Sequence, residues 1–242
     1  MRKLYEKNEL VFAILWIVAY CVICGTIRGN FGDESPIMTA VLALFTIGIF
    51  VFVKMNNLEE RYGLCKWRGR AADYWFFIPM FILMTGDLWG GFGMEYGGMA
   101  QVFAVVSMML IGFVEEMIFR VFLFRILLKK DPAPVAISIS AVTFGIGHII
   151  NLFTGQASFE TILQIVCAIA WGFIFTFVFY KSGSLLVCII VHSLVDVFSK
   201  FGTQSENDIL TTLSYVYVGA TIVSAVVYCI YLSRKPAALE RE

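Results

Sequence analysis

The sequence predicts an all-α, polytopic integral membrane protein with about eight transmembrane helices. Three observations support this fold class: 60% of the 242 residues are hydrophobic, only 15% are charged, and the apolar residues fall into long runs. A soluble domain carries about 25% charged residues. The composition therefore excludes an ordinary soluble domain. The sequence has no basic stripe that would bind nucleic acid, so we expect the partners to be the lipid bilayer and membrane-associated molecules.

Apolar runs separated by polar, glycine or proline residues define the candidate spans. They cover residues 9–27, 37–53, 74–92, 99–128, 134–152, 160–180, 184–199 and 211–232. The third run is interrupted at Gly86 and Asp87, which predicts a broken helix or a surface loop at its outer end. We expect one membrane domain, residues 1–242, in which spans 9–27, 37–53, 74–92 and 211–232 surround the core motifs of residues 99–200.

The basic residues predict the orientation of these spans. Fifteen of the 18 Lys and Arg residues fall in segments on the N-terminal side of the membrane, and Arg120 lies within a span. Only Arg28 and Lys200 fall on the other side. Cytoplasmic loops of membrane proteins carry an excess of Lys and Arg. We therefore expect a multi-pass protein with both termini in the cytoplasm.

Three charged residues interrupt the fourth span. Glu115, Glu116 and Arg120 lie in an apolar stretch, where each charge costs at least a few kcal/mol to insert. Glu116 and Arg120 are four residues apart with the acid first, a favourable helical pair. Glu115 points about 100° away from Glu116. We therefore expect Glu116 and Arg120 to form a structural pair, which leaves Glu115 to face the histidines.

Both histidines of the chain, His148 and His192, also lie in predicted spans. At a rise of about 1.5 Å per residue, Glu115 and His148 lie about 20 Å from the inner ends of their spans. His192 and Asp196 lie about 12 and about 18 Å from the inner end of the seventh span. Because three spans bring polar groups to a similar depth, the sequence predicts one shared site formed by spans 4, 5 and 7.

Such a site could work in two ways. Glu115, His148, His192 and Asp196 could hold Zn²⁺ with an open water position. Without metal, Glu115 could act as a general base on a water that His148 positions, while His192 and Asp196 stabilise the oxyanion or hold the substrate. Either route hydrolyses a peptide or amide bond. The sequence lacks H-E-x-x-H and G-x-S-x-G, which argues against a thermolysin-type or serine hydrolase.

The order of these motifs resembles a known family. Glu115-Glu116-x-x-x-Arg120, Phe144-x-x-x-His148 and His192-x-x-x-Asp196 follow one another as in the CAAX protease and bacteriocin-processing family (CPBP, also called ABI) of intramembrane endopeptidases. The resemblance covers residues 99–200. It implies a helical membrane peptidase with a cavity open toward the cytoplasm, in which Glu115 and His148 activate water and His192 and Asp196 line the oxyanion side.

The resemblance also implies supporting roles for Glu116, Arg120 and Phe144, and it favours a metal-free mechanism, with zinc as the alternative. The eukaryotic-type prenyl-protein proteases carry Asn where this chain has Asp196. This difference weakens the inference to prenylated CAAX substrates and strengthens the zinc alternative. The short loops are more similar to bacterial members, which process bacteriocins or peptide pheromones or confer immunity. We therefore expect an endopeptidase of the bacterial cell membrane.

Two other functions fit a membrane protein with buried charges. One is a non-catalytic immunity or regulatory protein that binds a membrane partner. The complete set of motif residues favours catalysis over this alternative. The other is a transporter that uses the buried charges as an ion path. Transporters usually contain inverted repeats and paired broken helices, and the sequence shows only one interruption, near residues 86–93.

Overall fold

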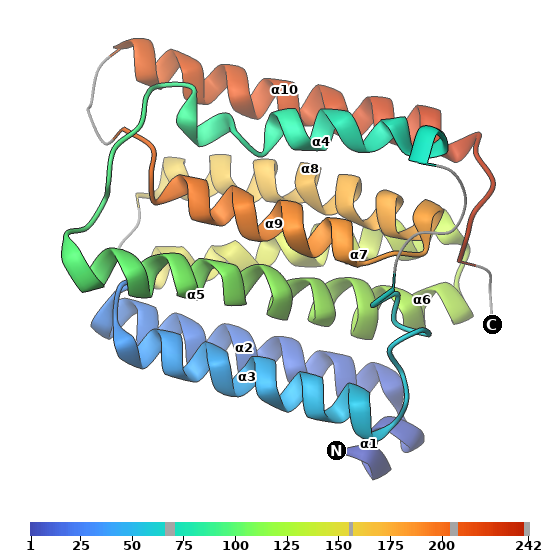
Figure 1. Cartoon of the computed structure of the whole chain (residues 1–242). Helices are drawn as coiled ribbons and strands as arrows, with labels where there is room; N and C mark the ends of the chain where they lie inside the picture. Colours follow the sequence, from blue (N-terminus) through green and yellow to red (C-terminus); the bar gives the residue numbers. More distant parts are fainter. Residues whose placement is uncertain (66–70, 155–156, 204–207, 240–242) are drawn as a thin grey trace.

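The computed structural model describes all residues except 66–70, 155–156, 204–207 and 240–242 (Figure 1). In chain order its elements are α1 (Arg2–Lys7), α2 (Glu9–Phe31), α3 (Pro36–Met55), η1 (Ala71–Phe77), α4 (Ile78–Leu83), η2 (Gly86–Leu88), α5 (Gly98–Glu116), η3 (Met117–Phe124), α6 (Arg125–Lys130), α7 (Ala133–Gly147), η4 (His148–Thr154), α8 (Ser158–Ser182), α9 (Leu186–Ser199) and α10 (Asp208–Ser233). The only β-pairing among the described residues is an isolated bridge between Phe92 and Gly202. The prediction of an all-α fold is confirmed.

Six helical stretches are long and apolar enough to cross a membrane: Glu9–Phe31, Pro36–Met55, Gly98–Lys130, Ala133–Phe153, Ser158–Ser182 and Ile209–Ser233. They correspond to six of the eight predicted spans. The predicted third span is divided into the short elements η1, α4 and η2. The predicted seventh span is the 14-residue helix α9, which is apolar but short. The predicted number of eight spans is therefore not confirmed within the described part of the chain.

Local sequence signals set several helix ends. The side chain of Asn8 accepts hydrogen bonds from the amides of Leu10 and Val11 and so caps the start of α2. Ser35 caps α3 in the same way, with Pro36 at the first helical position, where its missing N–H is tolerated. Gly183 ends α8 with a left-handed backbone conformation, φ 69°, that glycine adopts without strain.

Successive long segments run in opposite directions along the bundle (Figure 1). We call the end that holds α1, α6 and the last turn of α10 the terminal end of the bundle. We call the opposite end, with residues 32–35, residues 89–97 and Lys200, the distal end. α5 lies between α3 and α9, and α8 lies between α7 and α10. This arrangement places α5, α7 and α9, which carry the predicted site residues, in the middle of the bundle.

The central helix contains a π-helical segment directly after Glu115 and Glu116. α5 ends at Glu116, and η3 covers Met117–Phe124, all of whose residues are buried. π-helical turns are rare and frequently occur at functional sites. Ser140 of α7 donates a hydrogen bond of 3.0 Å to the carbonyl oxygen of Phe119 in this segment. The irregular backbone is thus fixed against α7, beside the predicted site.

Glycines allow the central helices to approach closely. A Cβ at Gly112 would lie 2.6 Å from the backbone nitrogen of Ser193 on α9. A Cβ at Gly145 would lie 2.8 Å from the backbone nitrogen of Ile169, and one at Gly172 would lie 2.9 Å from Cα of Ala141. Small residues permit close packing of membrane helices. The contact at Gly112 brings α9 against α5 less than one turn from Glu115.

Candidate active site

Glu115 is held by two side chains from other helices. The hydroxyl group of Tyr20 on α2 donates a hydrogen bond of 2.6 Å to Oε1 of Glu115. Oε2 of Glu115 lies 3.5 Å from Nε2 of His192 on α9. Tyr20, Glu115 and His192 are all buried. The carboxylate therefore has a fixed orientation, because both of its oxygens have partners on separate helices.

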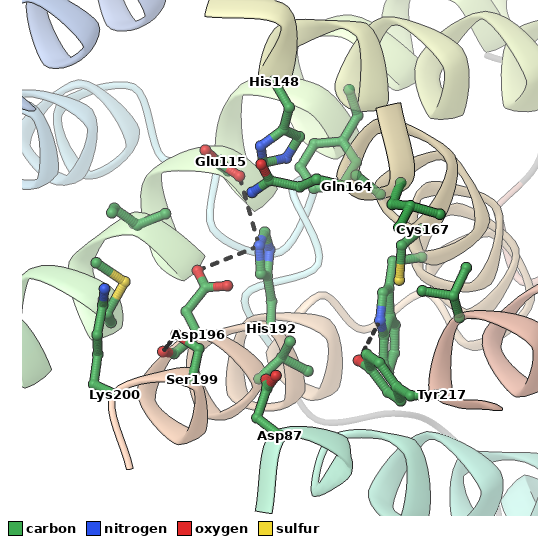
Figure 2. A pocket seen from close by; sticks show the side chains of 18 of the residues that line it. Asp87, Glu115, His148, Gln164, Cys167, His192, Asp196, Ser199, Lys200 and Tyr217 are labelled. Atoms are coloured by element: carbon green, nitrogen blue, oxygen red, sulfur yellow. Dashed lines mark hydrogen bonds and ion pairs between the residues drawn. The ribbon is translucent and has the colours of Figure 1, made fainter. Parts of the chain in front are cut away.

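His192 contacts three acidic side chains. Its Nδ1 lies 2.8 Å from Oε1 of Glu116, and its Nε2 lies 3.6 Å from Oδ2 of Asp196 as well as near Glu115. The ring is stacked on Phe175, with ring centroids 5.3 Å apart, and meets the edge of Phe144. Because Glu116 binds Nδ1, the other ring nitrogen, Nε2, faces Glu115 and Asp196 (Figure 2).

Glu116 and Arg120 form a completely buried ion pair. Arg120 Nη1 lies 3.2 Å from Glu116 Oε1, and both side chains have no exposed surface. The guanidinium group of Arg120 also lies over the ring of Phe144, 4.1 Å from its centroid, and over that of Phe175, at 5.3 Å. These aromatic faces stabilise the cation where water does not reach.

This geometry changes the expected division between the two glutamates. The pairing of Glu116 with Arg120 agrees with the prediction, but Glu116 also binds His192. Both carboxylates therefore face the same imidazole, from its two nitrogens. The 100° angle between adjacent helical residues does not separate them, because the ring of His192 lies across that face of α5 and reaches one carboxylate with each nitrogen.

His148 lies at the end of α7, where the helix tightens into the 3₁₀ segment η4. The edge of its ring meets Phe144, with centroids 5.7 Å apart. Figure 2 shows His148 on the same side of the site as Glu115, above His192. The structure therefore brings the four predicted residues Glu115, His148, His192 and Asp196 together, with Phe144 between the two imidazoles.

A cavity of about 440 Å³ adjoins these residues. Glu115, His148, His192 and Asp196 all line it, and α8 and α10 supply an opposite wall that includes Trp171 and Tyr217. A hydrogen bond of 3.0 Å from Trp171 Nε1 to the Tyr217 hydroxyl oxygen joins these two helices. The volume is in the usual range of ligand-binding cavities, and both polar and apolar side chains line it.

A second, smaller cavity of about 40 Å³ lies on the α2 side of the site. It is bordered by Tyr20, Glu115, Phe144 and His148, among others. A space of this size accommodates a water molecule, and the polar side chains around it supply hydrogen-bonding groups. The two cavities share Glu115 and His148, so these residues border both a water-sized space and a substrate-sized one.

Tyr20 is a site residue that the sequence interpretation missed. It lies in an apolar helix where tyrosine is an ordinary constituent, and its partner is 95 residues away along the chain. The sequence interpretation also missed four residues that line the main cavity, namely Asp87, Gln164, Trp171 and Tyr217. The interruption at Gly86 and Asp87 was the one sequence signal near any of them.

The site contains carboxylate and imidazole groups, which are common metal ligands. Within the described ranges, no group of three or more His, Cys, Asp or Glu side chains has an arrangement that could hold a metal ion. His192 contacts Glu116 through Nδ1, and it contacts both Glu115 and Asp196 through Nε2. This geometry does not fit a zinc centre built from Glu115, His148, His192 and Asp196. We derive no catalytic step through a metal ion.

Comparison with known proteins identifies a match to the segment that holds the site. Residues 98–198 match the family model described as type II CAAX prenyl endopeptidase Rce1-like. No curated protein matches the chain. The matched segment contains Glu115, Glu116, Arg120, Phe144, His148, His192 and Asp196. Over residues 98–198 the chain is therefore similar to a family of membrane proteases, the type II CAAX prenyl endopeptidase Rce1-like (CPBP) family, as its motifs predict.

Proposed function

We propose that this protein is an intramembrane endopeptidase in which Glu115 activates a water molecule to hydrolyse a peptide bond. The observation that carries the proposal is the position of the Glu115 carboxylate, fixed by Tyr20 and His192 and shared between the two cavities. Within the membrane domain, the catalytic spans are the predicted fourth, fifth and seventh. We expect no metal ion to take part.

In the proposed reaction, Glu115 takes a proton from water as the water oxygen attacks the scissile carbonyl carbon. His148, which borders the same small cavity, positions this water. The attack forms a C–O bond and places negative charge on the carbonyl oxygen. Glu115 then transfers the proton to the amide nitrogen as the C–N bond breaks, which releases a new amino terminus and a new carboxyl terminus.

His192 stabilises the oxyanion in this scheme. Glu116 accepts a hydrogen bond from Nδ1 of the imidazolium form, so that the Nε2 hydrogen is available at the cavity. A preorganised donor of this kind is worth roughly 3–4 kcal/mol of transition-state stabilisation in other hydrolases. Asp196 positions the ring from the same helix, at 3.6 Å from Nε2, and an ionised Asp196 carboxylate is not itself an oxyanion donor.

The substrate in this proposal is a membrane-associated protein or peptide. The proposed substrate is a bacteriocin, a peptide pheromone or an immunity target in a bacterial cell membrane, because the short loops of the chain are similar to those of bacterial family members. Because Asp196 stands where the eukaryotic-type prenyl-protein proteases carry Asn, the proposal does not include a prenyl group on the substrate. The proposed topology retains eight membrane segments, with the broken 71–88 segment and α9 as the two short ones, and both termini in the cytoplasm.

The direct test is Glu115→Gln. The amide keeps the size of the side chain but cannot take the proton from water, so turnover should fall at least about 100-fold. Peptides from membranes and culture medium would be compared between cells that produce the native protein and cells that produce the variant. Glu6→Gln, in the exposed helix α1, is the matched control. Unchanged processing in folded Glu115→Gln protein would contradict the proposal.

The alternative of a non-catalytic immunity or regulatory protein makes a different prediction. If the protein acts only by binding, its cellular phenotype should survive replacement of both Glu115 and His148 by Gln, provided the variant reaches the membrane at native abundance. A catalytic protein should lose the phenotype with either single replacement. Quantitative immunodetection of the membrane fraction establishes abundance in each case.

A further inference from the structure

The main cavity extends from the site to the distal end of the bundle. Arg28 lies three residues before the end of α2, and Asp33 lies in the loop that follows it. Lys200 caps the C-terminus of α9, and Glu160 lies in the first turn of α8. All four residues line the cavity. Its polar rim is therefore formed by chain segments at the distal end.

Ion pairs fix the shape of this rim. Arg28 Nε lies 2.6 Å from Asp33 Oδ1, and Lys200 Nζ lies 3.3 Å from Asp33 Oδ2. The same ammonium group lies 3.2 Å from Glu95 Oε2, in the segment before α5. Asp33 and Lys200 thereby connect α2, the end of α9 and residues 89–97 around one opening.

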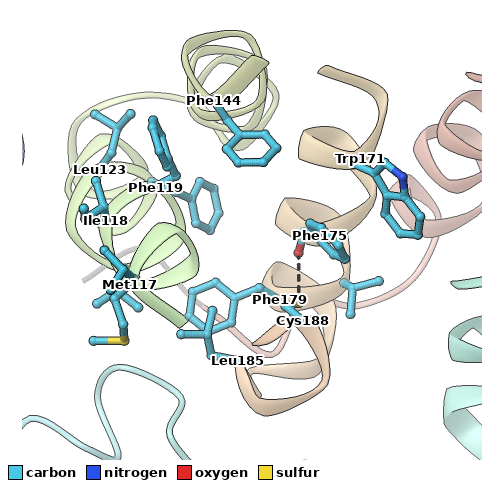
Figure 3. Close-up of a cluster of buried hydrophobic side chains, with 14 of the residues drawn as sticks. Met117, Ile118, Phe119, Leu123, Phe144, Trp171, Phe175, Phe179, Leu185 and Cys188 are labelled. Atoms are coloured by element: carbon cyan, nitrogen blue, oxygen red, sulfur yellow. Dashed lines mark hydrogen bonds between the residues drawn. The ribbon is translucent and has the colours of Figure 1, made fainter. Parts of the chain in front are cut away.

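The other side of the site is closed by apolar side chains. Phe124, Phe179 and Leu185 have no exposed surface, and their places in η3, at the end of α8 and before α9 put them toward the terminal end. Figure 3 shows Met117, Phe179 and Leu185 in one cluster of buried hydrophobic side chains. The rings of Phe124 and Phe179 pack edge to face, with centroids 6.2 Å apart. Among the described residues, the cavity lining includes none from α1, α6 or the last turn of α10. The site is thus connected with the distal end.

The charge distribution assigns sides to these two ends. Of the Lys and Arg residues that the structure describes, eleven lie in segments at the terminal end, whereas Arg28 and Lys200 are the two at the distal end. An excess of basic residues marks the cytoplasmic side of a membrane protein. The end with the cavity opening is therefore the end that this rule places outside the cytoplasm.

From these observations we infer that the catalytic cavity opens on the extracytoplasmic face of the membrane. The substrates are then exported or membrane-anchored peptides whose cleavage site lies on that face, with apolar residues that fit against Trp171 and Tyr217. This is opposite to the cytoplasmic opening that the family resemblance implies. The inference rests on the proposed endopeptidase function for the substrate class, but the direction of the opening can be tested without catalysis.

Introduced cysteines test which side each end faces. Gly97→Cys at the distal end is suitable because Gly97 is exposed and a Cβ there meets no atom within 4 Å. Lys3→Cys, in the exposed helix α1, is the matched variant at the terminal end. A membrane-impermeant maleimide should label Gly97→Cys in intact cells and Lys3→Cys only after permeabilisation, above the background of the six native cysteines. The reverse pattern would overturn the inference.

The native Cys167 tests the opening itself. Its side chain lines the main cavity, as do those of Gln164 and Trp171, and Figure 2 shows Cys167 on the same side of the cavity as Tyr217. A small, positively charged thiosulfonate reagent that does not cross membranes should modify Cys167 from outside intact cells, as measured by peptide mass spectrometry. Cys167→Ser is the control. Modification only in inverted vesicles would place the opening on the cytoplasmic side and contradict the inference.

Both labelling measurements can be made on Glu115→Gln protein, so they do not depend on turnover. Activity is then measured with a mixture of synthetic apolar peptides added to right-side-out or inverted vesicles. Cleavage that depends on Glu115 in right-side-out vesicles supports both proposals. Cleavage only in inverted vesicles supports the endopeptidase but overturns the extracytoplasmic opening. If Cys167 is labelled from outside but no peptide is cleaved on either side, the direction of the opening stands and the proposed function fails.

Discussion

Tyr20 and Glu115, 95 residues apart in the chain, are joined by a hydrogen bond of 2.6 Å in which the tyrosine hydroxyl donates to the carboxylate. This contact connects the first long helix, outside the matched segment of residues 98–198, to the centre of the site. Tyr20 therefore acts as a positioning residue for the carboxylate that we propose as general base.

We predict that Tyr20→Phe lowers turnover by roughly 10- to 100-fold, because a hydrogen bond to a charged group contributes about 1.5–3 kcal/mol. The effect should fall mainly on kcat, since the phenol orients the base and does not face the main cavity. Cleavage of a synthetic peptide in liposomes measures kcat and KM separately. Tyr215→Phe, on an exposed position of α10, should behave as the native protein. Equal losses in both variants would argue against a specific role for Tyr20.

The buried ion pair gives a prediction about stability. Arg120→Met removes the guanidinium partner of the buried Glu116 carboxylate, and loss of one partner of a buried ion pair should destabilise the protein by roughly 3–5 kcal/mol. The double variant Glu116→Gln/Arg120→Met removes both charges and should recover a large part of that loss. Thermal unfolding in detergent compares the three proteins. Turnover should stay low in the double variant, because a neutral amide does not stabilise the His192 imidazolium. A double variant less stable than Arg120→Met would contradict this account.

Close packing at Gly112 is expected to control the geometry of the site. Gly112→Ala places a methyl group within 2.6 Å of a backbone atom of Ser193, so α5 and α9 must separate. The separation lengthens the contacts of Glu115 and Glu116 with His192, and both the melting temperature and turnover should fall. Gly219→Ala on α10, where a Cβ meets no atom within 4 Å, is the matched control and should leave both unchanged. A Gly112→Ala protein with native turnover would show that the approach of α9 is not needed.

The ion pairs at the distal rim predict a dependence of stability on pH. Burial alone would raise the pKa of Asp33, but the neighbouring Arg28 and Lys200 outweigh it and lower the pKa below its ordinary value. A lowered pKa means that the Asp33 contribution is fully present above about pH 4 and is lost as the pH falls through the lowered value. Melting temperatures between pH 6 and pH 3 should therefore fall more steeply for the native protein than for Asp33→Asn. Parallel curves would contradict this assignment.

Removal of metal ions should leave the activity intact, because the described residues contain no group of three or more His, Cys, Asp or Glu side chains that could hold a metal ion. Turnover of a synthetic peptide would be measured before and after dialysis against a strong chelator, with metal content determined by mass spectrometry. Loss of turnover that zinc restores would show that the site residues rearrange around a metal ion and would replace the metal-free scheme.

The charged and histidine residues of the site could be found from the sequence because they are energetically anomalous in apolar spans. Glu115, Arg120 and His192 are each polar residues among apolar neighbours. The rise of the helix alone places the polar residues of the three spans at a similar depth in the membrane. The joint role of Glu116 could not be found in this way. It depends on the position of the His192 ring, which the contact of α9 with Gly112 decides.

Two features of the fold also could not be predicted in full from the sequence. The interruption at Gly86 and Asp87 correctly predicted a break, but not that the break divides the whole 71–88 segment into short elements. The π-helical turn after Glu116 could not be predicted from the sequence, because every residue of the segment except Arg120 is an apolar one that any buried helix uses. Backbone irregularities of this kind are stabilised by neighbouring helices, here by Ser140 of α7.

The sequence by itself determined the all-α membrane class and indicated the residues that we propose for the chemistry, because hydrophobic length and buried charge are properties of the chain before it folds. Its basic residues also predicted which end of the bundle faces the cytoplasm. Only the tertiary structure decided that Tyr20 holds Glu115, that His192 joins both glutamates and that the cavity reaches the distal end. These relationships depend on side chains from separate helices meeting in space, and helix packing, not local pattern, determines where they meet.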